Sequence, residues 1–279
     1  MSQSDQSDPL NLLPPAGRAS RTIREVRGLV SDPSERRRRS VLIAEGIHLA
    51  EEALRTPGRV RLALASPRLL RTAEGRAVAA RLGAGAVESR RLDDDLLARL
   101  CQAGSHQGIL LVVDHPHHAA ADLTRSPDPP LVLVACGVQD PGNLGALARV
   151  AEAAWASGLA CAGGADPWSA RSVRASAGSL LRLPVAEFAD PPEAASQLHS
   201  LGLRRLGATP RAAQGYREAE LQGPMALFVG GEGAGLDPAT EAAMDDRVRI
   251  PMKEGVESLN VAAAAAVLLF EAAGRRRRP

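Results

Sequence analysis

The sequence predicts an α/β protein with a largely parallel sheet in its C-terminal half and a smaller α/β unit before it. Two observations support this: apolar runs alternate with helical patterns after residue 130, and these runs are apolar throughout instead of alternating with polar residues. Continuous apolar runs are typical of parallel strands that helices cover on both faces. The expected strands lie at 131–138, 159–162, 183–188, 206–209, 226–230 and 248–251.

The remaining segments divide the chain into four parts. Residues 1–20 are rich in Ser, Asp, Gln and Pro and are expected to form a flexible tail. Residues 21–113 form the smaller unit, whose first ordered element is expected after the arginine run 36–39. Residues 114–130 end in a Pro-rich stretch typical of a stiff, extended linker, and 131–279 form the larger domain. In the smaller unit, strands are expected at 41–43, 60–65 and 108–113, and helices at 47–54, 69–82 and 94–100.

Composition excludes several classes of function. Aromatic residues make up 2% of the chain, which disfavours an RNA-binding surface built on stacked rings. The formal net charge of +2 is too small to identify a nucleic-acid partner. Nearly all basic residues are arginine, with Lys253 the one lysine, and a biased genome composition explains this better than phosphate recognition does.

Cysteine and histidine usage favours a reducing, cytoplasmic setting with no metal. The three cysteines are isolated, so neither a disulfide framework nor a zinc ribbon is expected. Three histidines at 115, 117 and 118 lack Cys or carboxylate partners at ligand spacing and are interpreted as linker residues. The N-terminus has no signal-peptide pattern, and the apolar stretch 261–270 is too short to span a membrane.

Ligands bind at the carboxyl ends of strands in parallel sheets, so the loops that leave the predicted strands are candidate sites. The first loop, 139–145, leads into a helix at 146–156. Asn143 is expected to cap this helix, while Arg149 lies among packing residues and is suited to grip a phosphate. A solvated surface role explains Arg149 equally well from this segment alone.

The second loop, 231–236, is rich in glycine, which allows a ligand to approach the backbone. Asp237-Pro238 then predicts a helix N-terminus. A dinucleotide fingerprint is disfavoured because most of the domain precedes these glycines, and a P-loop is excluded because no Gly-Lys-Ser/Thr follows. The loop therefore stays a candidate ligand site that matches neither of these two motifs.

The third segment, 257–260, precedes a helix at 261–273 that is apolar on every side and is expected to be buried. Ser258 and Asn260 stand where an N-cap belongs. Because one capping residue suffices, the second polar side chain is available to a ligand.

Together and in this order, these segments resemble the three motifs of the SpoU (TrmH) family of RNA 2′-O-ribose methyltransferases. A softer resemblance links the smaller unit to the substrate-binding domain that often precedes such enzymes. The matching residues in the smaller unit are Glu45-Gly46-Ile47-His48-Leu49 and Glu52-Ala53-Leu54. Those in the larger domain are Asn143-Leu144-Gly145-Ala146 with Arg149, Arg174-Ala175-Ser176-Ala177-Gly178, Gly230-Gly231-Glu232-Gly233 with Gly235-Leu236, Ile250-Pro251-Met252 and Ser258-Leu259-Asn260-Val261.

The resemblance implies a SPOUT-type catalytic domain whose C-terminal segment forms a trefoil knot, an exception to the usual unknotted topology. It also implies a homodimer with the active site near the subunit interface, and S-adenosyl-L-methionine (SAM) bound in the knot. The residues it implies for the reaction site are Asn143, Arg149, Glu232, Ser258 and Asn260. Those it implies for the cofactor are Thr209, Gly230, Gly231, Glu232, Ile250, Met252, Ser258, Leu259 and Asn260.

Methyl transfer from a sulfonium chiefly requires alignment of donor and acceptor. A free guanidinium stays protonated at physiological pH, so Arg149 is expected to hold a phosphate or stabilise the developing alkoxide instead of acting as a base. Asn143 and Asn260 would orient the ribose, and Glu232 would fix the glycine loop or Asn143.

Three alternatives stay open. The additional N-terminal domain favours rRNA over tRNA as the substrate. A non-catalytic knotted RNA-binding relative is disfavoured because the motif side chains are intact, and a nicotinamide-dependent dehydrogenase is disfavoured by the position of the glycines. For the arginine runs 36–39 and 275–278, phosphate contact and a solubilising surface are both considered, and the first run has the better case for phosphate.

Overall fold

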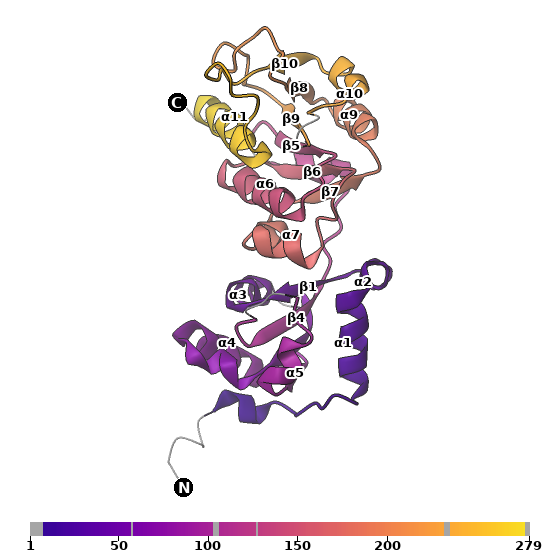
Figure 1. Ribbon diagram of the computed structural model, residues 1–279, viewed down its shortest axis with the longest axis vertical. Helices are drawn as coiled ribbons and strands as arrows, with labels where there is room; N and C mark the ends of the chain where they lie inside the picture. Colours follow the sequence, from indigo (N-terminus) through magenta and orange to yellow (C-terminus); the bar gives the residue numbers. More distant parts are fainter. Residues whose placement is uncertain (1–7, 57, 103–105, 127, 232–234, 277–279) are drawn as a thin grey trace. The chain divides into compact units, whose positions relative to one another are not determined.

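The computed structural model describes residues 8–56, 58–102, 106–126, 128–231 and 235–276, which group into two compact units (Figure 1). The first takes in the described residues up to His115 together with Trp168–Arg174, and the second takes in the rest. The sequence had assigned 168–174 to the larger domain, but Arg174 lies 3.8 Å from the buried carboxylate of Glu45, at the end of a strand of the first unit.

The first unit is built on a four-stranded sheet in the order β1-β4-β2-β3, in which β4 is antiparallel to β1 and β2. One face of the sheet packs against apolar side chains of α1 and α5. Its elements are η1 (Pro9–Leu12), α1 (Arg21–Ser31), α2 (Pro33–Arg39), β1 (Val41–Glu45), α3 (Ile47–Arg55), β2 (Val60–Ala65), η2 (Pro67–Arg71), α4 (Ala73–Gly83), β3 (Ser89–Arg91), α5 (Asp94–Ala98) and β4 (Ile109–Asp114).

The flexible tail predicted for residues 1–20 is wrong for the described residues 8–20. Leu10 is fully buried and Leu13 is 5% exposed, so the segment anchors itself to the unit. It also pairs with β3, because Arg91 N donates to Pro14 O and Ala16 N donates to Arg91 O, both at 2.9 Å. The prediction failed because it rested on the overall Ser- and Asp-rich composition of the segment, which gives no weight to two single leucines. Residues 1–7 lie outside the described part of the chain.

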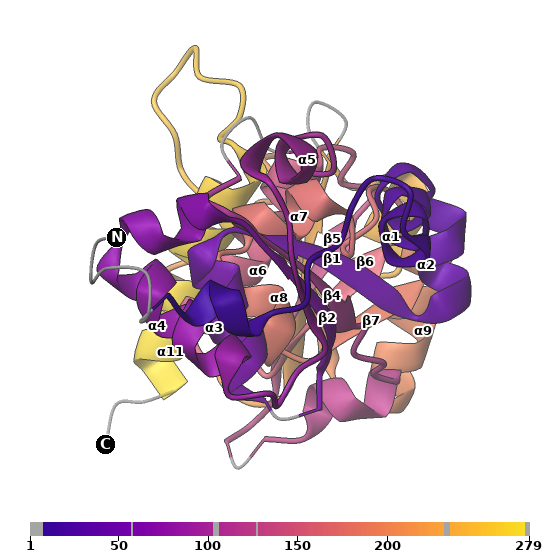
Figure 2. The same ribbon diagram turned by 90° about the horizontal axis from the view of Figure 1, so that it is seen from below.

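Two helices precede the first strand, contrary to the prediction that order begins after the arginine run. Ser20 caps α1 by accepting from Ile23 N, and Asp32 caps α2 by accepting from Ser34 N. The buried face of α1 consists of Ile23, Val26 and Leu29, which pack on the sheet. Helices α1 and α2 follow each other directly and are in contact, with α2 at the C-terminal end of α1 (Figure 1 and Figure 2).

Arg36 has a structural role. It therefore fits neither role considered for the run 36–39, a phosphate contact or a solubilising surface residue. Its side chain is buried and donates through Nη1 to Leu29 O at 2.8 Å and Val30 O at 3.2 Å. These carbonyls belong to the last turn of α1, where the helix itself supplies no donors. One member of the arginine run therefore closes the end of α1.

The second unit is a six-stranded, fully parallel sheet in the order β10-β8-β9-β5-β6-β7. Helices α6 and α11 pack on one face, while α9, α10 and η3 pack on the other (Figure 1). Its elements are η3 (Ala120–Thr124), β5 (Leu131–Cys136), α6 (Pro141–Ala153), β6 (Gly158–Ala162), α8 (Ser179–Arg182), β7 (Val185–Phe188), α9 (Pro191–Ser200), β8 (Arg204–Ala208), β9 (Met225–Gly230), α10 (Pro238–Ala242), β10 (Asp246–Val248) and α11 (Val261–Arg276), while α7 (Ala170–Ala175) belongs to the first unit as far as Arg174.

The predicted number of six strands is found, but β10 is at 246–248 and shares only Val248 with the strand predicted at 248–251. Two other expectations also need correction. The linker at 114–130 is not extended throughout, because η3 interrupts it and Leu123 is fully buried in the core of the second unit. Helix α11 is not buried on every side, because Val267 and Phe270 are 37% and 48% exposed.

In the second arginine run, 275–278, the two described residues, Arg275 and Arg276, also have structural roles. Arg276 donates to the backbone carbonyls of Leu221 and Pro129, and Arg275 donates to that of Ala219. Burial lowers the pKa of Arg276 to about 10. Residues 277 and 278 lie outside the described residues.

Within the described ranges, no helix is both long and apolar enough to cross a membrane. The same part of the chain contains no group of three or more His, Cys, Asp or Glu side chains placed to hold a metal ion.

The burial of Leu10 gives a stability prediction. Leu10→Ala should lower the free energy of unfolding by about 2–5 kcal/mol, because it removes a fully buried side chain and leaves a cavity. The matched control is Leu12→Ala, because Leu12 is 71% exposed, and its effect should stay within about 0.5 kcal/mol. Urea denaturation measures both, and equal effects would contradict the anchoring of this segment.

Candidate functional site

The candidate site lies at the C-terminal ends of the strands of the second sheet, where strands that are distant in sequence end next to each other. Cys136, the last residue of β5, pairs in register with Gly230, the last residue of β9. The chain leaves β5 towards β6 on one side and leaves β9 towards β10 on the other. This edge is therefore a topological switch point, the place where open parallel sheets bind ligands.

The glycines after β9 allow the chain to fold tightly back on itself. A Cβ atom on Gly230 would lie 2.0 Å from the carbonyl carbon of Gly235, which no side chain tolerates. Gly231 and Gly235 form an antiparallel bridge in which Gly235 N donates to Gly231 O at 3.1 Å. Of the predicted site residues, Glu232 falls within 232–234 and lies outside the described residues.

Asp237 fixes the return of the chain after this loop, as the sequence predicted. Its carboxylate caps α10 by accepting from Ala239 N and Thr240 N, both at 3.0 Å. Hydrogen bonds from the Thr240 side chain and then its backbone hold the pKa of Asp237 below its usual value. The carboxylate therefore remains charged and keeps the cap at neutral pH.

The neighbouring strand ends carry other predicted cofactor residues. Thr209 follows β8, is 5% exposed, and donates its backbone N–H to Val248 O at 3.0 Å. Ile250 follows β10 by two residues, and both Ile250 and Met252 are half-buried. Because β10, β8 and β9 are successive neighbours in the sheet, Thr209, Gly230 and Ile250 lie at or just after the ends of three adjacent strands.

Asn143 does not cap the helix that follows β5, which corrects the sequence-based assignment. Asp140 is the N-cap of α6, and its Oδ1 accepts from Gly142 N at 2.6 Å. Asn143 instead lies in the first turn of α6 and is half-buried. Its side chain is therefore available for another role.

That role involves Asn260, 117 residues later in the chain. Asn260 Oδ1 caps α11 by accepting from Ala262 N at 3.0 Å and Ala263 N at 3.3 Å. Its Nδ2 consequently points the other way and donates to Asn143 Oδ1 at 3.0 Å. In the described part of the chain no partner contacts Asn143 Nδ2, so that group can donate to a ligand.

The other predicted reaction residues are not joined to this asparagine pair. Arg149 lies six residues beyond Asn143, about 9 Å further along the axis of α6, and is exposed. Ser258 and Leu259 are exposed in the segment before α11. Within the described residues, no hydrogen bond or ion pair links Arg149 or Ser258 to the pair.

Cys136 lies at the same strand edge, but its environment argues against a nucleophilic role. Its side chain is buried, and burial raises the pKa of the thiol above its ordinary value. A thiol without thiolate character is a poor nucleophile. Cys136 is therefore not a candidate nucleophile for this site.

Comparison with known proteins gives the family. Residues 130–270 match the SpoU rRNA Methylase family. The 23S rRNA guanosine 2′-O-methyltransferase RlmP of Bacillus subtilis (strain 168) is 31% identical over 241 residues, which cover 86% of this chain and 91% of RlmP.

Two solved structures resemble the whole chain. The SpoU methyltransferase AviRb from Streptomyces viridochromogenes, in complex with the cofactor AdoMet, has a TM-score of 0.82 and 27% identity, covering 92% of this chain and 98% of AviRb. An RNA 2′-O ribose methyltransferase has a TM-score of 0.79 and 31% identity, covering 95% of this chain and 99% of that protein.

The fold and the motifs define a methyltransferase with a parallel α/β domain, and the chain belongs to the SpoU rRNA Methylase family. The family resemblance and the α/β fold class predicted from the sequence are confirmed.

The close contact between Gly230 and Gly235 predicts that replacing Gly230 by alanine lowers the stability of the second unit strongly. Gly230→Ala should destabilise the second unit by about 3 kcal/mol, the upper end of the usual cost of overpacking, because its Cβ would overlap backbone atoms that cannot move aside without distorting the loop. Gly274→Ala is the matched control, since a Cβ there meets nothing within 4 Å. Thermal unfolding compares the two, and a Gly230→Ala protein as stable as the control would refute the tight turn between Gly230 and Gly235.

Proposed function

We propose that this protein transfers a methyl group from SAM to a ribose 2′-hydroxyl of rRNA, with 23S rRNA as the favoured substrate. The relative RlmP supports this substrate, because its similarity to this chain extends over both units. The observation that carries the proposal is the Asn143–Asn260 pair beside the switch point of the parallel sheet.

The residues at the strand ends fit SAM. The half-buried side chains of Ile250 and Met252 and the exposed Leu259 offer apolar surface to an adenine ring. The backbone around Gly230 and Gly231 carries no side chain that would keep a ligand away. SAM, when bound, supplies a methyl group on a positively charged sulfur, whose displacement requires an in-line nucleophile.

The asparagine pair would position that nucleophile. The cap of α11 fixes the Asn260 amide, and the amide in turn fixes Asn143 Oδ1. Asn143 Nδ2 is then directed as a donor to a ribose oxygen. Arg149 would hold the adjacent phosphate or stabilise the alkoxide that develops on the 2′-oxygen, because a guanidinium donates to anionic oxygens in pairs.

The same proposal includes a homodimer. The solvent face of α11 carries Ala263, Val267 and Phe270 at helical spacing, and this apolar stripe suits burial against a second copy. The separation of Arg149 from Asn143 also favours a site completed at a subunit interface. We further propose a trefoil knot, which membership of the SpoU rRNA Methylase family supports, and a cytoplasmic location, which the rRNA-modifying relatives support.

The smaller unit is proposed to bind the RNA substrate. RlmP and AviRb both match this chain over more than four fifths of its length, so the unit is shared with methyltransferases of the same family. An additional RNA-binding unit suits a large folded RNA, which favours rRNA over tRNA.

The site assignment predicts a loss of catalysis without a loss of folding. Asn143→Ala and Arg149→Ala should each lower methyl transfer to rRNA by at least about a hundredfold, because each removes a positioning or charge-stabilising group. Transfer of labelled methyl groups from SAM to separate rRNA and tRNA pools measures this. Arg99→Ala is the matched control, an exposed arginine of the other unit. Near-normal activity of both site variants would overturn the assignment.

The apolar stripe predicts the oligomeric state. Phe270→Ser should shift the protein from dimer to monomer in analytical ultracentrifugation, because Phe270 is the largest side chain of the stripe. The control is Leu201→Ser, at a residue on the opposite face of the sheet that is 39% exposed. A wild-type protein that sediments as a monomer at micromolar concentration would exclude the dimer.

A further inference from the structure

The positive charge of the chain is concentrated in one short segment. Residues 18–39 contain eight arginines and three acidic residues, a formal net charge of +5. The whole chain carries +2, so the rest of it is net negative. This segment comprises α1 and α2, which are in contact.

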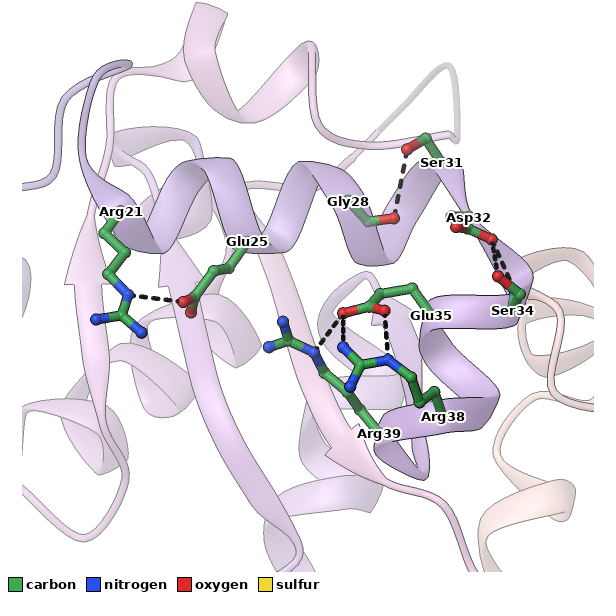
Figure 3. A network of polar contacts seen from close by, with 9 residues as sticks. All are labelled: Arg21, Glu25, Gly28, Ser31, Asp32, Ser34, Glu35, Arg38 and Arg39. Carbon is green, nitrogen blue, oxygen red and sulfur yellow. Dashed lines mark hydrogen bonds and ion pairs between the residues drawn. The ribbon is translucent and has the colours of Figure 1, made fainter.

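The three acidic residues of the segment are engaged locally (Figure 3). Glu25 accepts from Arg21 Nε at 2.9 Å, and Asp32 caps α2 through Ser34. Glu35 accepts from both Arg38 and Arg39, and these hydrogen bonds hold the pKa of Glu35 below its usual value. Glu35 is therefore one ionised carboxylate shared by two guanidinium groups.

These contacts orient the arginines without using up their donors. Arg21 and Arg39 are each held through Nε, and a guanidinium has four further N–H donors on its two terminal nitrogens. Their side chains remain 88% and 38% exposed. The terminal donors are thus exposed to solvent and available to an anion.

Three more arginines of the segment are wholly available. Arg18, Arg24 and Arg27 are exposed, and within the described residues no hydrogen bond or ion pair engages their side chains. Arg21, Arg24 and Arg27 recur every three residues along α1, so neighbouring guanidinium groups can reach successive anionic groups of one ligand.

Gly28 is the least expected residue of this surface. It lies in the interior of α1, where glycine weakens a helix, yet a Cβ there would meet nothing within 4 Å. Internal packing therefore does not require glycine. Gly28 does line a groove of about 560 Å³ between α1 and α2, together with Arg21, Arg24 and Arg39. Glycine at this point keeps the groove open to a backbone that approaches closely.

We propose that the α1–α2 surface, defined as residues 18–39, binds the phosphate backbone of the RNA substrate, with Arg24 and Arg27 as phosphate contacts and Gly28 as the floor of the groove. The inference rests on the proposed function. The outer face of α1 consists of Arg21, Arg24, Arg27, Gly28 and Ser31 and offers no apolar side chain for insertion into a lipid surface. Phosphates of RNA require only the cations that this face supplies.

The test measures binding to an unmodified 23S rRNA transcript as a function of salt concentration. Arg24→Gln/Arg27→Gln should weaken binding at least tenfold and lower the slope of log K against log salt by roughly 1.5, since each lost phosphate contact removes about 0.7–0.9. Arginine and glutamine have similar helix propensities, so α1 should stay folded. The matched control is Arg71→Gln/Arg99→Gln, which removes the same charge from exposed positions elsewhere in the unit.

A second pair of variants tests the groove. Gly28→Glu should weaken RNA binding at least tenfold, because its side chain enters the groove with a negative charge. Gly28→Ala should raise Tm, which shows that the helix tolerates the substitution, and should weaken binding less than Gly28→Glu. Equal RNA affinity for Gly28→Glu and wild type would overturn the assignment of the groove.

The outcomes separate this proposal from the proposed function. An unchanged salt slope in Arg24→Gln/Arg27→Gln, with methyl transfer to rRNA intact, overturns the α1–α2 surface alone. So does binding of wild-type protein to anionic phosphatidylserine vesicles that the double variant loses while its RNA affinity stays normal. A reduced slope in the double variant, with no methyl transfer by the wild type, supports the surface and refutes the proposed reaction. SAM-induced stabilisation should be the same in all variants, because the cofactor residues are untouched.

Discussion

Parallel pairing of β9 with β5 is the constraint on which the candidate site depends. It brings the loops after two strands that are about ninety residues apart to one edge of the sheet, with Cys136 in register with Gly230. Helices α6 and α11 then pack together on the same face (Figure 1). Their N-terminal turns can meet only because of that packing, and the bond between Asn143 and Asn260 is the result.

The same constraint explains which parts of the fold the sequence could predict. The central strands β5, β6 and β9 of the second sheet are buried, so each one is a continuous apolar run that stands out locally. The Asp237-Pro238 cap is likewise a local signal. The asparagine pair is different, because its partners are 117 residues apart and each taken alone is interpreted as a helix cap. Only Asn260 performs that role, since Asp140 caps α6.

The roles of the arginines were the hardest to predict from the sequence. Adjacent or similar positions serve unlike purposes: Arg36 closes the end of α1, Arg276 binds backbone carbonyls of the second unit, and Arg24 faces solvent. Composition cannot separate these roles, because they depend on which carbonyl or carboxylate the fold places nearby. The tail prediction was wrong for a related reason, since Leu10 is one apolar side chain in a polar segment and its burial depends on the sheet behind it.

The central claim is that the strand edge around Gly230 and the asparagine pair transfer a methyl group to a ribose hydroxyl of rRNA. The most direct measurement is to incubate the wild-type protein with methyl-labelled SAM and unmodified 23S rRNA, and then to hydrolyse the RNA with alkali. A 2′-O-methylated ribose blocks cleavage of the adjacent phosphodiester bond, so the account predicts that the label appears in an alkali-resistant dinucleotide from one position. Label in a mononucleotide, which would place the methyl group on a base, or no label in rRNA at all would contradict it.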